Sequence, residues 1–120
     1  MGEYKIKFFA DPETGRIPVK EYLDDAPDKE RQKILKHIEF LREHEGILDE
    51  PYSKHIRGKI RELRVDFGKS RHRVFFFTFV GKNIILLHAF LKRTAKTPEP
   101  ASAKALKNFY KVLNNAKLYE

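Results

Sequence analysis

Two arginines, a histidine and a lysine are the residues of this chain whose types and spacing best suit chemistry on a phosphodiester. The stretch "LLHAFLKRTAKTP" carries His88 among apolar residues and Lys92 where they end, and two earlier apolar segments contain Arg64 and Arg73. A guanidinium fork matches two phosphate oxygens at once, and an imidazole titrates near neutral pH. These four residues are therefore our candidate catalytic group. For His88, a core histidine bonded to backbone is the alternative.

Further basic residues flank these segments and are candidates for binding a polyanion such as a nucleic-acid backbone. They are Lys54, His55, Arg57, Arg71, Arg93 and Lys96. The first three lie on a segment before Gly58 that could close over a substrate, and His55 is a second acid–base candidate. A solvated basic surface is the alternative for this group.

The charge of the chain is concentrated in its middle. The 120 residues carry a net charge of +8, yet residues 1–53 hold 13 Asp and Glu residues against 9 Lys and Arg residues. Residues 54–96 hold 12 Lys and Arg residues and two acidic ones. Such a field attracts polyanions, because each phosphate that is neutralised releases counterions. The pattern favours a nucleic acid or an acidic protein as partner.

The composition predicts neither a cofactor nor a metal site. The chain has no cysteine and no "HExxH" motif, and a reducing compartment suits a cysteine-free protein. The longest apolar runs, "VFFFTFV" and "IILLHAFL", are far shorter than a membrane span. We therefore expect a cytoplasmic protein without a membrane partner.

The apolar pattern predicts an α+β fold of order β-α-α-β-β-β-α in a single domain over residues 1–120. We expect strands at about 3–10, 59–67, 71–80 and 83–91, and helices over 18–27, 28–46 and 98–115, with a loop over 47–58. The turns "GKS" and "GK" are short enough for hairpins, so the sheet is predicted to be mostly an antiparallel meander.

Strand alternation then assigns side chains to faces. Glu62 and Arg64 share one face of their strand, and Arg71 and Arg73 share one face of the next. On the last strand, alternation places Ile84, Leu86, His88 and Phe90 together. The phenylalanines Phe75–Phe77 are expected in the core rather than as a base-stacking platform. Hairpin geometry brings Arg73 near Lys92, so a cationic concavity is predicted at one edge of the sheet.

The residues that carry these predictions also resemble a known family. A lysine before a glycine, then "RELR", an "RVFF" strand, "LLHAFLKRTAKTP" and a helix with "ALKNFY" follow one another as in the HigB-like toxins of the RelE/ParE superfamily. With the "PVKEYL" helix, the resemblance covers nearly the whole chain. Arg61 stands where the family often has Trp, and His72 and Phe76 stand where tyrosines are common.

The resemblance implies a toxin of a type II toxin–antitoxin system with a small antiparallel sheet, two N-terminal helices and a C-terminal helix. Many members cleave mRNA on the ribosome without a metal, and a cognate antitoxin, here expected to be a small helix-turn-helix protein, inhibits them. Two alternatives remain open at this point. One is a ParE-like inhibitor that binds DNA gyrase, and the other is a non-catalytic RNA-binding module.

Overall fold

The computed structural model describes residues 3–93, 95 and 98–120. Its elements are β1 (Lys5–Phe8), α1 (Pro18–Asp25), α2 (Asp28–Glu43), β2 (Ser53–Arg57), β3 (Ile60–Phe67), β4 (Ser70–Phe79), β5 (Asn83–Leu91), α3 (Glu99–Asn114) and a 3₁₀ turn η1 (Ala116–Tyr119). The α+β class predicted from the sequence is confirmed. The chain contains one strand more than predicted, because β2 lies within the segment that we expected to be a loop.

The strands form one mixed sheet of order β1-β5-β4-β3-β2. Strands β2 to β5 are antiparallel neighbours, as expected for a meander, whereas β1 pairs with β5 in parallel. The parallel pair arises because the chain crosses over through α1, α2 and the meander before β5 returns beside β1. β2 is therefore one edge strand and β1 the other.

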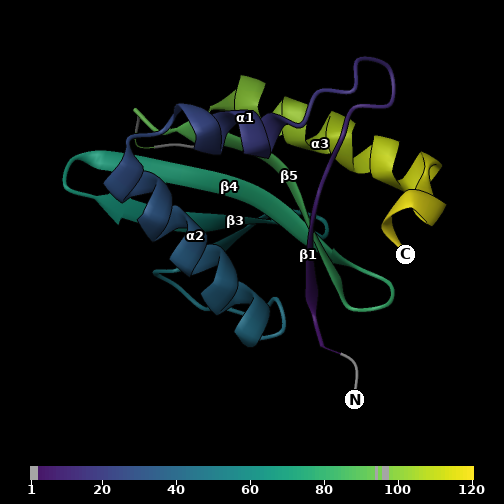
Figure 1. The fold of residues 1–120 in the computed structure, drawn as a ribbon, viewed down its shortest axis with the longest axis horizontal. Coiled ribbons are helices and arrows are strands. Elements are labelled where there is room, and N and C mark those ends of the chain that lie inside the picture. The colour runs from purple at the N-terminus through teal and green to yellow at the C-terminus, as the bar shows by residue number, and fades with distance from the viewer. Residues whose placement is uncertain (1–2, 94, 96–97) are drawn as a thin grey trace.

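The two faces of the sheet are covered by different helices (Figure 1). On one face, α1 and α2 bury Val19, Leu23 and Ile34 against the sheet, and on the other α3 buries Ala105 and Val112. Strand residues alternate between these two cores, which explains why β4 and β5 are apolar on both faces. The expectation that Phe75–Phe77 belong to the core is confirmed, since each is at most 1% exposed.

One face of α2 is apolar, and the helix ends before a glycine. Ile34, Ile38 and Leu41 recur at helical spacing and are buried. Gly46 has a φ of +78°, and its N–H donates to the carbonyl oxygen of Leu41 at 2.9 Å. This left-handed glycine closes the helix in the manner typical of helix C-termini.

A β-bulge between β4 and β5 changes one predicted face. Phe75 pairs with His88 but Phe76 pairs with Leu86, so Leu87 is an extra residue in β5. A bulge of this kind turns two consecutive side chains to one face. His88 therefore joins Leu87 and Phe90 on the α3 side, whereas Leu86 packs toward α2. The prediction that Ile84, Leu86, His88 and Phe90 share a face was wrong for this reason.

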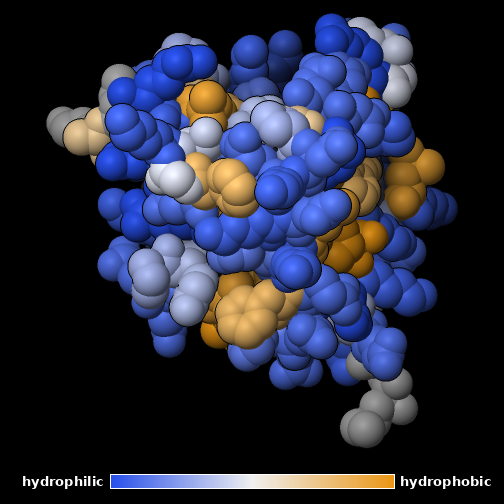
Figure 2. Space-filling view, turned by 60° about the vertical axis from the view of Figure 1, so that its left-hand side comes forward, coloured by the Kyte–Doolittle hydropathy of each residue, from blue (hydrophilic) through white to orange (hydrophobic). Residues whose placement is uncertain are grey.

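The surface turned forward in Figure 2 is dominated by hydrophilic side chains, and its apolar patches are small and separated. None of the helices formed by the described residues is long and apolar enough to cross a membrane.

Candidate functional site

Paired residues of four strands form three rows on the α3 face of the sheet. The first row is Lys54, Glu62, Phe75 and His88, the second is Arg64, Arg73 and Phe90, and the third is Asp66, Arg71 and Lys92. Lys92 follows β5, and its backbone N–H donates to the carbonyl oxygen of Arg71 at 2.8 Å. We call Lys54, Arg64, Arg71, Arg73 and Lys92 the cationic face. Residues from 54 to 92 are thus gathered by sheet pairing alone.

A buried carboxylate lies beneath these cations. Glu62 is fully buried. Its Oε1 lies 3.4 Å from the Nε of Arg64 and 3.8 Å from the Nε of Arg73. An ionised carboxylate in such a position requires compensating charge, which the two guanidiniums supply. Sequence reasoning missed Glu62 as a site residue, although the alternation in "RELR" already placed it beside Arg64.

Arg73 is held rigidly within the sheet. Its side chain is 6% exposed, and its Nη1 donates to Asp66 Oδ1 at 2.8 Å and to the carbonyl oxygen of His72 at 3.0 Å. Its Nε is buried and has no hydrogen-bond acceptor among the described residues. Arg64 is more exposed, at 23% of its side chain. Arg64 is therefore placed to touch a ligand directly, while Arg73 adds a fixed charge beneath it.

Charged side chains of the third row are in contact with solvent, since Arg71 and Asp66 are both exposed. Burial alone would raise the pKa of Asp66. The hydrogen bond from Arg73 and the positive charges of Arg73, Arg71 and Arg64 outweigh burial, so the pKa of Asp66 is lower than its ordinary value. Asp66 is therefore ionised at neutral pH and orients Arg73.

Lys92 lies within the same field. Burial lowers its pKa, the charge of Glu62 opposes this, and the positive charges of Arg73, Arg64 and Lys54 lower the pKa further. A lysine with a lowered pKa is a better proton donor near neutral pH. The described geometry thus brings Lys92 together with both candidate arginines.

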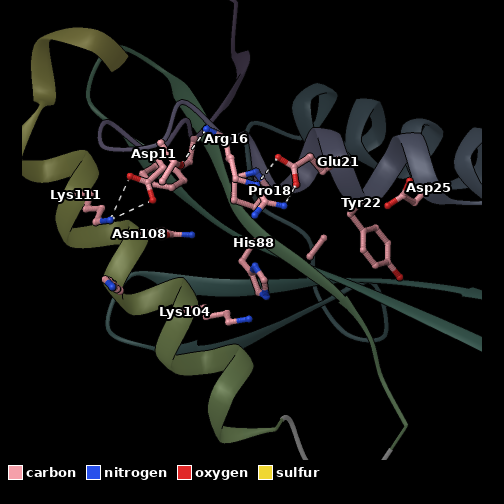
Figure 3. Close-up of a pocket in the computed structure, with 14 residues that line it drawn as sticks. Asp11, Arg16, Pro18, Glu21, Tyr22, Asp25, His88, Lys104, Asn108 and Lys111 are labelled. Carbon is pink, nitrogen blue, oxygen red and sulfur yellow. Dashed lines mark hydrogen bonds and ion pairs between the residues drawn. The ribbon is translucent and has the colours of Figure 1, made fainter.

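His88 lies in the first row, beside a cavity of about 480 Å³ between α1 and α3 (Figure 3). Burial and then the charge of Lys104 lower the pKa of His88 to about 4, so its imidazole is neutral at neutral pH. Lys92 lies four positions further along the chain, which corresponds to about 13 Å between the two Cα atoms in extended backbone. His88 and Lys92 therefore flank the Arg64 row from opposite sides.

The other predicted RNA-binding residues are spread more widely. Lys54 and Arg71 lie on the cationic face, whereas His55 occupies the alternate position in β2 and its Nε2–H donates to the carbonyl oxygen of Gly58 at 2.8 Å. Arg57 lies at the β2–β3 turn. Arg93 is exposed beyond β5, and its charge acts on Tyr22 of α1. Lys96 lies outside the described residues.

A second buried polar group lies on the opposite face of the sheet. The imidazole of His72 bonds through Nδ1 to the hydroxyl of Tyr22 and through Nε2 to Glu30, both at 2.7 Å. Burial and the charge of Glu30 raise the pKa of Tyr22 to about 12. This chain of hydrogen bonds ties α1 and α2 to β4, and no sequence pattern indicated it.

The three departures from the family pattern lie on that opposite face too. Arg61 pairs with Phe76 and its Nε donates to Ser53 Oγ at 3.1 Å, and His72 belongs to the buried group just described. They are therefore separated from the cationic face by the thickness of the sheet. Among the described residues, no cluster of three His, Cys, Asp or Glu side chains could hold a metal ion.

Comparison with known proteins gives one family. Residues 21–110 match the model of a family described as phage derived protein Gp49-like (DUF891). The match runs from α1 into α3 and includes every residue of the cationic face. A search of curated proteins gives no match.

Proposed function

Since the chain belongs to the Gp49-like family, a RelE/ParE-like toxin family of toxin–antitoxin systems, we propose that it is a HigB-like toxin that cuts mRNA on the translating ribosome. The family implies an antitoxin as partner, which we expect to be a small helix-turn-helix protein. The observation that carries the proposal is the convergence of Lys54, Arg64 and Lys92 over the buried carboxylate of Glu62.

The proposed reaction is an attack of the ribose 2′-hydroxyl on the neighbouring phosphorus. The bond from O2′ to phosphorus forms and the bond from phosphorus to O5′ breaks, which leaves a 2′,3′-cyclic phosphate and a 5′-hydroxyl. Negative charge develops on the phosphorane oxygens, and Arg64, backed by Arg73, is placed to stabilise it. A fixed donor of this kind contributes roughly 10²–10³ in rate.

Two proton transfers complete the reaction. In an in-line displacement the attacking and leaving oxygens lie on opposite sides of the phosphorus. His88 and Lys92 lie in the rows on either side of the Arg64–Arg73 pair. In this proposal the ammonium of Lys92 donates a proton to O5′, and His88, whose lowered pKa makes it a weak base, accepts the proton of the 2′-hydroxyl. Both groups exchange protons with solvent before the next turnover.

The exposed cations have a separate role in this proposal. Lys54, Arg71 and Arg93 project into solvent and would bind the backbone of mRNA or ribosomal RNA as charges that do not touch the reacting atoms. Their removal should weaken binding in a salt-dependent manner.

The proposal is tested by adding the purified protein to translating ribosomes and mapping the mRNA ends. We expect internal cuts whose downstream fragments carry a 5′-hydroxyl. Intact message in the presence of correctly folded protein would overturn the enzyme proposal. A gyrase supercoiling assay run in parallel detects the ParE-like alternative, and RNA binding without cleavage identifies the non-catalytic one.

A further inference from the structure

A groove of about 610 Å³ runs beside α3, on the side of the helix away from His88. Its walls come from the β2–β3 turn, the start of β3, the end of β4, and α3. The lining residues are Arg57, Gly58, Lys59, Ile60, Phe77, Thr78, Phe79, Val80, Leu106, Phe109, Tyr110 and Leu113. This groove is distinct from the cationic face, none of whose residues line it.

Large apolar side chains remain exposed around this groove. Val80 is 59% exposed, Tyr110 55% and Leu113 41%. The floor is aromatic, since the rings of Phe77 and Phe109 are in edge contact at 4.7 Å between centroids. Exposed apolar residues that gather in one place, rather than singly, mark an interaction surface.

The groove continues along α3 toward the start of the helix. A neighbouring cavity of about 170 Å³ shares Arg57, Ile60 and Leu106 with it and extends to Glu99. From Glu99 to Leu113 the helix rises about 21 Å, at about 1.5 Å per residue. A second helix of about four turns would match this length.

The charged residues that line the groove indicate what kind of partner it would bind. The larger groove contains Arg57 and Lys59 and no carboxylate, whereas Glu99 lies only at the far end of the smaller cavity. On α3, Leu106, Tyr110 and Leu113 are spaced four and three residues apart, so they form a ridge of the kind on which another helix packs. We propose that this groove binds an amphipathic helix of a partner protein, apolar toward α3 and acidic along the edge that meets Arg57 and Lys59. The inference does not depend on RNA cleavage.

The test uses two synthetic helical peptides of about four turns each and the full chain. Both carry leucines at helical spacing. One has glutamates along one flank and the other has lysines at the same positions. Affinity is measured by fluorescence anisotropy, and the binding surface is mapped by backbone NMR shifts. We expect the acidic peptide to bind with shifts confined to the groove, and the basic peptide to bind at least about tenfold more weakly.

Two exposed positions supply matched variants. Val80→Asp places a charge in the groove, and Ile47→Asp places the same charge at a residue that is 73% exposed and does not line the groove. We expect Val80→Asp to weaken binding of the acidic peptide at least about tenfold, and Ile47→Asp to leave its affinity unchanged. Because both residues are exposed, both variants should fold.

Three results would overturn the inference. The first is equal binding of the acidic peptide to Val80→Asp and to Ile47→Asp. The second is a set of NMR shifts centred on Arg64 and Lys92, which would make the cationic face the acceptor. The third is a dimer in sedimentation velocity that Val80→Asp dissociates, since a second copy of the chain would then occupy the groove. None of these depends on whether the chain cleaves RNA, so failure here is separate from failure of the proposed function.

Discussion

Replacing Glu62 by glutamine removes the charge that holds the two central arginines together and almost preserves the volume of the side chain. At 3.4 and 3.8 Å, the attractions between Glu62 and the guanidiniums of Arg64 and Arg73 amount to about 5 and about 4 kcal/mol at an effective dielectric constant of about 20. The cost of burying the carboxylate offsets part of this. Removing one partner of a buried ion pair typically costs about 3–5 kcal/mol, and we expect about 3 kcal/mol because glutamine keeps one acceptor oxygen.

The free energy of unfolding is measured in urea at pH 7 for Glu62→Gln and for Asp66→Asn. Asp66 pairs with Arg73 at 2.8 Å, but its side chain is 62% exposed, so its loss should cost about 1 kcal/mol or less. The Glu62 variant also has an effect on Lys92. Because the charge of Glu62 raises the pKa of Lys92, Glu62→Gln should lower that pKa further, which NMR titration of the lysine side chain detects.

If Glu62→Gln lowers the free energy of unfolding no more than Asp66→Asn does, the view that a buried carboxylate organises the cationic face is refuted. So would a pKa of Lys92 that rises or stays unchanged.

Three further predictions concern stability. Burial lowers the pKa of His88 to about 4, whereas the imidazole of an unfolded chain titrates at about 6.5. As the pH falls, the unfolded chain therefore takes up the proton first. The free energy of unfolding should fall by up to about 3 kcal/mol between about pH 6.5 and pH 4. Urea titrations at several pH values should show that this dependence is shallower in His88→Gln between about pH 6.5 and pH 5; a slope equal to that of the wild-type protein would contradict it. Tyr22→Phe leaves Nδ1 of His72 without its hydrogen-bond partner and should lower the free energy of unfolding by about 1–3 kcal/mol. An unchanged free energy of unfolding would show that a hydrogen bond to water replaces the one to Tyr22. Gly46→Ala should cost roughly 1–2 kcal/mol for its left-handed backbone, with a further penalty because the new Cβ would lie 2.5 Å from Thr78 Oγ1. Thermal unfolding checks this, and an unchanged midpoint would show that the turn after α2 accepts a side chain without strain.

The sequence predicted most of the fold because its strands are strongly patterned. The strand expected over 83–91 has those bounds in the structure, and the strands expected over 59–67 and 71–80 differ from β3 and β4 by one residue at the ends. The short turns between these strands contain glycine, so the hairpins could be predicted from the sequence. β2 was missed because its segment is polar, is flanked by Pro51 and Gly58, and becomes a strand only by pairing with β3. Tertiary pairing, rather than local preference, decides such an edge strand.

The candidate site was predictable where strict alternation holds. Arg64 and Arg73 form a cross-strand pair, which is the juxtaposition that parity and hairpin geometry indicated. His88 was assigned to the wrong set of neighbours because Leu87 is an extra residue in β5, and nothing in "IILLHAFL" marks a bulge. Glu62 escaped notice because a glutamate is normally expected in solvent. Its burial depends on two arginines that the sequence alone does not place around it.

The catalytic role of the cationic face is decided by comparing Arg64→Ala with Arg57→Ala in the ribosome assay, with cut sites and end groups mapped. Both variants remove one arginine from a strand or turn of the same sheet, but only Arg64 lies on the cationic face above Glu62. We expect 5′-hydroxyl ends from the wild-type protein, a cleavage rate roughly 10²–10³ lower in Arg64→Ala, and a rate close to wild type in Arg57→Ala. Equal rates in the two variants, or fragments ending in a 5′-phosphate, would contradict the proposed mechanism.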